Sequence, residues 1–138
     1  MPGRNLPPPD IEKLIDASKK ALAFSSPIYS GFRVGAAVES ADGRIFTGCN
    51  IENASLGLSV CAERVALLKA LSEGATALKA IAVICGSGET CYPCGSCRQM
   101  LMEFAPDIRV VLPSKKSVKV MGLRELLPLP FIKTPPHK

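Results

Sequence analysis

Two short segments of this sequence carry side chains that can bind a metal. One covers residues 61–63 (Cys-Ala-Glu) and the other covers residues 93–97 (Pro-Cys-Gly-Ser-Cys). Each lies where a loop is predicted to become a helix, and the free backbone N–H groups and dipole at a helix start favour thiolate. Thiolates of Cys61, Cys94 and Cys97 therefore predict a site for one Zn²⁺ per subunit, with the open fourth position that is typical of catalytic zinc.

A carboxylate stands beside this predicted zinc site. Glu63 is two residues from Cys61, close enough to reach a metal-bound water without displacing it. Such a water needs a base to take its proton, a leaving group needs the proton returned, and one carboxylate can do both. The pattern C-x-E…P-C-x-x-C is the three-cysteine form of the zinc-deaminase signature. Glu63 is therefore the predicted catalytic residue.

Arg64 is predicted to support the same site from behind the ligands. Three thiolates give the zinc ligand set a net negative charge, which works against deprotonating a bound water. A guanidinium three residues from Cys61 can offset this charge by donating hydrogen bonds to the ligand sulfurs. The alternative is that Arg64 forms a surface salt bridge.

The remaining cysteines leave other interpretations open. With the three predicted ligands, Cys91 would complete a four-cysteine structural zinc site, and a lone C-x-x-C is also compatible with a redox pair. Cys91 precedes Pro93 in a loop, whereas the C-x-x-C cysteines share one helix start, and this difference favours the three-cysteine site. Cys49, Cys85 and Cys91 are interpreted as buried or incidental thiols.

The composition narrows the function classes. The single histidine, His137, lies one residue before the C-terminus, which argues against a Ser-His-Asp triad, a Cys-His protease or a histidine zinc site. Lys and Arg exceed Asp and Glu by 17 to 12, but they form no basic run with interleaved aromatics, so we expect no nucleic-acid partner. Without an apolar stretch of about 20 residues or a signal-peptide core, we expect no membrane partner and a cytoplasmic location.

The elements that must position these residues follow from periodicity and turn signals. Asp10 is the predicted N-cap of a helix that ends before Ser25, and Asp42-Gly43 predicts a β-hairpin. The order α-β-β-α-β-α-β-β-α indicates an α/β fold of three layers (α-β-α) with a single mixed five-stranded sheet and helices on both faces. A tight turn joins the last two strands. The predicted strands are 34–38, 44–51, 80–85, 108–112 and 117–121, and the later helices are 61–73, 94–104 and 123–127.

The chain length and composition indicate one folded unit. A chain of 138 residues with 47% hydrophobic and 21% charged residues suits a single hydrophobic core. We therefore expect residues 1–138 to form one catalytic domain, with an extended N-terminal arm at 1–9 and a mobile tail at 132–138.

Beyond the two metal segments, residues 29–131 resemble the short, homotetrameric, zinc-dependent cytidine deaminases of the cytidine and deoxycytidylate deaminase superfamily. Two positions differ from the residues usual in that family: Arg33 stands where proline or a small apolar residue is common, and Leu56 stands where tyrosine is common. The matching segments are 29–37 (YSGFRVGAA), 47–55 (TGCNIENAS), 61–64 (CAER), 93–99 (PCGSCRQ) and 125–128 (ELLP).

The resemblance implies roles for individual residues. It implies that the three cysteines bind zinc and that Glu63 shuttles the proton. It also implies that Asn50 and Glu52 hold the ribose hydroxyls, that Phe32 lines the nucleoside pocket, and that Ala62 of the Cys-Ala-Glu segment contacts the substrate.

The position of Phe131 leads to an expectation about the oligomeric state. It lies three residues after the proline of the Glu-Leu-Leu-Pro segment, and the resemblance implies that this ring packs on the pyrimidine in a neighbouring subunit. We therefore expect a homotetramer whose active sites are completed by neighbouring subunits. The alternative is that Phe131 covers the core of its own subunit.

The implied function is zinc-dependent hydrolytic deamination of cytidine and 2′-deoxycytidine to uridine and 2′-deoxyuridine, with release of ammonia, in pyrimidine salvage. One alternative is a blasticidin-S-type nucleoside deaminase, which shares the PCG-x-CRQ and ELLP segments. The pair Asn50 and Glu52 suits two sugar hydroxyls and therefore favours an ordinary nucleoside such as cytidine over blasticidin S. A polynucleotide-editing deaminase is disfavoured, because the resemblance implies a helix between the last two strands of such enzymes. Here only the turn at 113–116 joins these strands. A non-catalytic structural zinc module is the remaining alternative.

Overall fold

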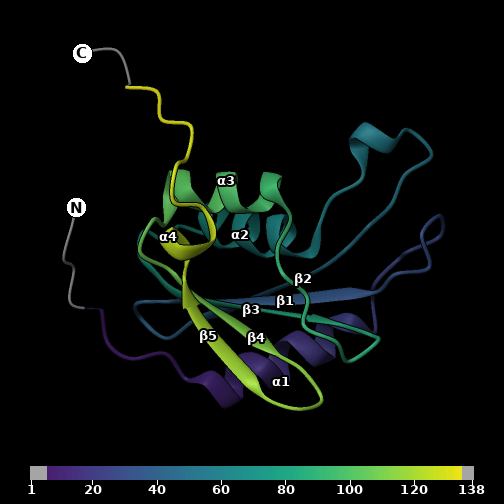
Figure 1. The fold of residues 1–138 in the computed structure, drawn as a ribbon, viewed down its shortest axis with the longest axis horizontal. Coiled ribbons are helices and arrows are strands. Elements are labelled where there is room, and N and C mark those ends of the chain that lie inside the picture. The colour runs from purple at the N-terminus through teal and green to yellow at the C-terminus, as the bar shows by residue number, and fades with distance from the viewer. Residues whose placement is uncertain (1–5, 135–138) are drawn as a thin grey trace.

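A five-stranded mixed sheet with the strand order β2-β1-β3-β4-β5 forms the middle layer of the structure (Figure 1), a computed structural model that describes residues 6–134. The β1–β2, β1–β3 and β4–β5 pairs are antiparallel, and the β3–β4 pair is parallel. The elements are α1 (Ile11–Leu22), β1 (Val34–Ser40), β2 (Ile45–Cys49), η1 (Leu56–Leu58), α2 (Ala62–Ser72), β3 (Leu78–Cys85), α3 (Gly95–Phe104), β4 (Arg109–Pro113), β5 (Val118–Gly122) and α4 (Leu123–Leu126). The predicted fold class and element order are confirmed.

Helices cover both faces of the sheet, with α1 on one face and α2 and α3 on the other (Figure 1). The predicted N-cap holds, because the Asp10 carboxylate accepts a hydrogen bond from the Lys13 backbone N–H at 3.2 Å. Leu14 of α1 is fully buried in a cluster with small residues of β1 and β3. The larger core cluster lies on the opposite face, under α2 and α3. Among residues 6–134, no helix is both long and apolar enough to cross a bilayer.

Strand β1 extends two residues beyond the predicted end at 38 and reaches Ser40. Glu39 and Lys79 of the neighbouring strand β3 are both buried and form an ion pair at 3.2 Å, and Glu39 also accepts the Asp10 backbone N–H at 2.9 Å. The ion pair allows these two charged residues to be buried inside the sheet. In the sequence, a charged residue after an apolar run indicates the end of a strand, so the predicted strand was too short.

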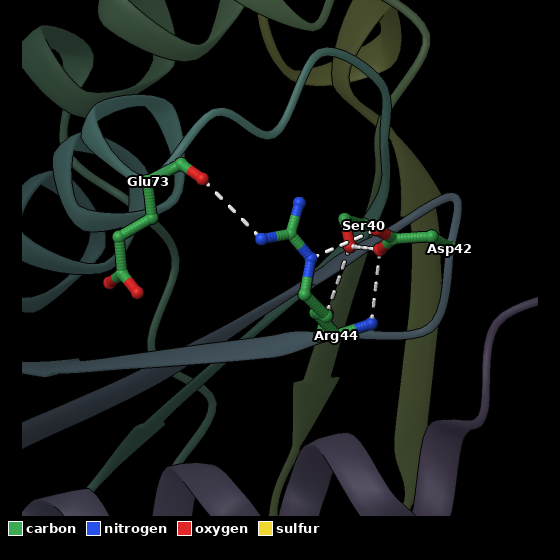
Figure 2. A network of polar contacts seen from close by, with 4 residues as sticks. All are labelled: Ser40, Asp42, Arg44 and Glu73. Carbon is green, nitrogen blue, oxygen red and sulfur yellow. Dashed lines mark hydrogen bonds and ion pairs between the residues drawn. The ribbon is translucent and has the colours of Figure 1, made fainter.

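The predicted Asp-Gly hairpin joins β1 to β2, and Gly43 adopts a φ of 89°. Figure 2 shows how the turn is held: the Asp42 carboxylate accepts hydrogen bonds from Ser40 and from the Arg44 backbone and side chain. These contacts, the Ser40 hydrogen bond first, lower the pKa of Asp42. Arg44 also donates to the Glu73 carbonyl at 3.4 Å, so the hairpin is tied to the C-terminal end of α2.

The parallel β3–β4 pair requires a crossover connection, and α3 provides it. In contrast, β4 and β5 are antiparallel and are joined by the predicted tight turn, with Ser114 N–H donating to the Ser117 carbonyl at 2.8 Å. Residues 6–9 of the predicted arm are neither helix nor strand. The rest of the arm, His137 and the end of the predicted tail lie outside the described residues.

Helix α2 lies unusually close to β2 at Gly48. A Cβ atom at this position would lie 2.5 Å from both the Ala62 carbonyl oxygen and the Ala66 backbone nitrogen. The absence of a side chain thus lets the first turn of α2 approach the sheet. This turn carries the predicted catalytic glutamate.

Gly48→Ala should therefore destabilise the fold, because either the helix or the strand must move. Overpacking of this kind costs about 1–3 kcal/mol, and we expect a lower midpoint of thermal unfolding. Gly57→Ala is the matched control, since a Cβ there meets no atom of the described residues within 4 Å. Equal midpoints for the two variants would contradict the close-approach argument.

Candidate metal centre and substrate cavity

Three cysteine sulfurs meet between the starts of α2 and α3. Cys61 is the N-cap of α2, Cys94 is the N-cap of α3, and Cys97 lies in the first turn of α3. The Cys61 and Cys94 Sγ atoms are 4.0 Å apart, those of Cys94 and Cys97 are 3.6 Å apart, and all three lie within 4.8 Å of one another. Tetrahedral zinc with Zn–S bonds of about 2.3 Å places its sulfurs about 3.8 Å apart. The donor set and its spacing fit zinc.

The protonation of these sulfurs reflects their mutual contact. A hydrogen bond from Cys97, together with weaker effects from Cys94 and the Arg64 charge, lowers the pKa of Cys61 to about 5. The same hydrogen bond and burial raise the pKa of Cys97 well above its usual range. The opposite directions of the two pKa shifts follow from this close contact between the sulfurs. A divalent cation that binds all three sulfurs displaces the remaining protons.

Cys91 does not belong to this cluster. Among residues 6–134, the group of side chains close enough to share a metal comprises the other three cysteines. Cys91 packs against the hydrophobic core, and burial raises its pKa to about 12. It therefore remains a neutral thiol at physiological pH, and the sulfur positions favour the three-cysteine site over the four-cysteine alternative.

Glu63 lies in the first turn of α2 with only 5% of its surface exposed. Burial, with a smaller contribution from the charge of Cys61, raises the pKa of its carboxyl group. A carboxyl group with a raised pKa both accepts and returns a proton more readily near neutral pH. Its position and environment suit the predicted role in proton transfer.

A cavity of about 280 Å³ opens beside the sulfur cluster. This volume is close to the lower end of the range of small-molecule pockets, roughly 300–1,000 Å³. The structure brings most of the predicted substrate-binding residues together in its wall. The lining residues are Ser30, Phe32, Val34, Asn50, Glu52, Ser59, Val60, Cys61, Ala62, Glu63, Cys91, Tyr92 and Cys94.

Asn50 is buried where the cavity wall meets the sheet, and most of its hydrogen-bonding capacity is already used. Its Oδ1 accepts from Ser25 Oγ at 2.6 Å and from the Val34 backbone N–H at 2.9 Å, and its Nδ2 donates to the Phe32 carbonyl at 2.7 Å. Since an amide has two donors and two acceptor positions, one N–H has no partner within residues 6–134 and can meet a ligand. Asn50 therefore orders the cavity wall and also retains a free donor.

Phe131 does not line the cavity of its own chain. The residue is 66% exposed, which contradicts the alternative that it covers its own core. The Gln99 side chain of α3 donates to the Phe131 carbonyl at 2.9 Å and accepts its N–H at 3.1 Å. Figure 1 shows the segment after α4 running past α3 and away from the sheet. This arrangement leaves the ring free to contact another molecule.

Sequence reasoning missed the residue that fixes the loop before α3. The Arg98 guanidinium donates to the Pro93 carbonyl at 2.7 Å and to the Leu126 carbonyl at 2.8 Å. It thereby holds the segment that presents Cys94 against α4. The two acceptors are 33 residues apart in the chain and both are backbone carbonyls, so one sequence offers no signal for the contact.

Arg64 lies behind the sulfur cluster. One of its terminal nitrogens donates to the Ser59 carbonyl at 3.0 Å, while its Nε is buried without a hydrogen-bond partner among the described residues. The ion pairs found within residues 6–134 involve other side chains. The surface-salt-bridge alternative thus has no support in this part of the chain. The positive charge of Arg64 helps to lower the pKa of Cys61.

Arg64→Ala should reduce both turnover and zinc retention, because the negative charge on the ligand sulfurs loses its partner. Loss of a residue that supports metal ligands typically costs about 10–100-fold in affinity or activity. Zinc content after dialysis and the rate of deamination measure the two effects. Arg124→Ala, which removes an exposed ion pair with Asp107, is the control. Arg64→Ala protein that matches the control in both measurements would contradict this role.

The comparisons with known proteins agree with this geometry. Residues 9–113 match the family model for the cytidine and deoxycytidylate deaminase zinc-binding region. The chain is 43% identical over 126 residues to the cytidine deaminase of Sporosarcina psychrophila, covering 90% of this chain and 93% of that protein. It is 44% identical to cytidine deaminase from Burkholderia pseudomallei, whose crystal structure superposes with a TM-score of 0.82 over 87% of this chain and 98% of that one. The extent of the match, together with three sulfurs at zinc spacing beside a buried glutamate, shows that the chain belongs to the cytidine deaminase family.

Proposed function

We propose that this protein is a zinc-dependent cytidine deaminase that converts cytidine and 2′-deoxycytidine to uridine and 2′-deoxyuridine and releases ammonia. The observation that carries the proposal is that one cavity is lined by Cys61, Cys94, Glu63, Asn50 and Glu52. Metal ligands, a proton-transfer group and polar groups for a sugar thus face the same space.

The proposed reaction assigns the proton transfers to Glu63. When bound, zinc supplies Lewis-acid activation of water at neutral pH. Glu63 accepts a proton from the attacking water, and its carboxyl group then protonates ring nitrogen N3 as the oxygen adds to C4. Glu63 then accepts the proton of the new hydroxyl group at C4 and passes it to the amine, which leaves as ammonia while the C4 carbonyl of uridine forms. Burial of Glu63 keeps bulk water from competing for these protons.

The polar wall of the cavity supports a nucleoside substrate. Asn50 keeps one donor for a sugar hydroxyl and Glu52 presents a carboxylate acceptor, while Phe32 offers an aromatic ring. A site built to pair with a hydroxyl disfavours ligands that lack it, because its own polar groups are left unsatisfied. A free pyrimidine base should therefore be a poor substrate.

The alternatives predict different substrates. A blasticidin-S-type deaminase acts on that antibiotic nucleoside, an editing deaminase acts on polynucleotides, and a structural zinc module releases no ammonia at all. Ammonia release should be measured with free cytidine, blasticidin S and single-stranded RNA under the same conditions. We expect rapid release from cytidine, and preferential release from either of the other two substrates would contradict the proposal.

We further propose that residues 1–138 act as one catalytic domain in the cytoplasm, within pyrimidine salvage, and that four copies assemble. All six cysteines are free, as expected in a reducing compartment. Apolar side chains of the η1 segment and of the C-terminal segment are exposed, among them Leu56 at 75% and Leu129 at 91%. Association of copies would remove this apolar surface from water.

In such an assembly the exposed ring of Phe131 can complete the cavity of a neighbour. Truncation after Leu129 should then raise the Michaelis constant for cytidine about tenfold, because ring stacking contributes roughly 0.5–1.5 kcal/mol beyond area burial. Steady-state kinetics and sedimentation of the truncated chain measure the effect. Truncation after Ile132, which keeps Phe131, is the control. A fully active monomer, or a truncated tetramer with unchanged kinetics, would remove Phe131 from the active site.

A further inference from the structure

The carboxylate of Glu52 is held by the loop that precedes β1. Its Oε1 accepts hydrogen bonds from the Tyr29 and Ser30 backbone N–H groups at 2.9 and 2.8 Å, and its Oε2 accepts one from Ser30 Oγ at 2.5 Å. These bonds, with that of the Ser30 hydroxyl first, lower the pKa of Glu52. The carboxylate is therefore ionised and fixed in orientation before any ligand arrives.

The Ser30 hydroxyl joins this carboxylate to the aromatic residue of the cavity. While it donates to Glu52, its oxygen accepts the Phe32 backbone N–H at 3.0 Å. Between them, Gly31 adopts a φ of 72°, a conformation that allows the chain to turn back toward the hydroxyl. One side chain thus sets the positions of two residues of the cavity wall.

The same loop is anchored at its other end through Asn50. Arg33 donates to the Ser25 carbonyl at 2.8 Å, and the Ser25 hydroxyl donates to Asn50 Oδ1 at 2.6 Å. The polar residues expected to meet the sugar therefore share one supporting loop. Among residues 6–134, Ser30 is the only residue whose side chain donates a hydrogen bond to Glu52.

A carboxylate offers about four lone-pair positions, and the loop fills three of those on Glu52. The remaining position lies on Oε2, the oxygen that Ser30 orients. We propose that Ser30 is a positioning residue for sugar recognition, because it aims the free lone pair of Glu52 at a ribose hydroxyl. This inference rests on the proposed nucleoside deaminase function and adds a determinant of specificity to it.

The test compares substrates with and without the sugar hydroxyls. Ser30→Ala should lower kcat/KM for cytidine roughly 10–100-fold, mainly through KM, because a hydrogen bond to a charged group is lost. For 2′,3′-dideoxycytidine, measured with enzyme in excess, the loss should be less than about threefold. Ser30→Thr keeps the hydroxyl and should restore most of the cytidine activity.

The control is Ser114→Ala, which removes a hydroxyl that likewise accepts backbone N–H groups, but in the β4–β5 turn. It should leave both substrates unaffected. Equal losses of Ser30→Ala on both substrates, or no loss on either, would overturn the proposal. Wild-type turnover of cytidine tests the proposed function separately. If the wild type is inactive, the same comparison is made with the thermal shift that each nucleoside produces.

Discussion

Glu63→Gln should retain zinc and lose nearly all turnover. Glutamine keeps the size of the side chain and its hydrogen-bonding oxygen, but it cannot accept a proton. General acid–base catalysis contributes about 10²–10⁴-fold for one transfer, and Glu63 serves at least two transfers in the proposed reaction. We therefore expect kcat to fall by about 10⁴-fold or more, while the zinc content and the thermal midpoint stay near those of the wild type.

Glu103→Gln is the matched control, since this glutamate is exposed on α3 and should leave kcat unchanged. A Glu63→Gln protein with zinc bound and kcat within tenfold of the wild type would show that another group moves the proton. Loss of zinc in this variant would instead show that Glu63 helps to hold the metal.

Cys97→Ala should abolish zinc binding and with it the activity. Cys97 is fully buried between the starts of the two helices, so its loss leaves two sulfurs, too few to hold a zinc tightly with an open position. We expect less than about one tenth of the wild-type zinc content. The thermal midpoint should also fall, because a bound metal stabilises the native state.

Cys49→Ala provides the comparison for this prediction. Cys49 is a half-buried free thiol in β2 outside the sulfur cluster, and its removal should leave zinc content and turnover unchanged. Full zinc content in Cys97→Ala would contradict the assigned ligand set, as would loss of zinc in Cys49→Ala.

The chemistry of the metal centre could be predicted from the sequence because it depends on local features. A thiol at a helix start is visible from the break between turn residues and helical periodicity, and Cys61 and Cys94 are indeed N-caps. The Asp-Gly turn and the Asp10 cap are likewise local signals, and both were correct. The element order followed from these signals.

Contacts between distant segments could not be predicted in this way. The close approach of α2 at Gly48, the Arg98 link to α4 and the Ser30 contact with Glu52 each join residues that only the folded chain brings together. The extent of β1 was also missed, because the burial of Glu39 depends on Lys79 in another strand. The pattern of polar and apolar residues shows which side chains are charged, but it does not show which other residue each of them contacts in the fold.

Zinc dependence of the reaction should be measured by titrating metal-depleted protein with zinc while ammonia release from cytidine is assayed. We expect activity to rise in proportion to bound zinc and to reach its plateau at one zinc per subunit. Cys97→Ala should stay inactive throughout, and Glu63→Gln should bind the zinc without gaining activity. Full deaminase activity in the metal-depleted wild type, or a wild type that fills with zinc and releases no ammonia, would contradict the proposed zinc-dependent deamination.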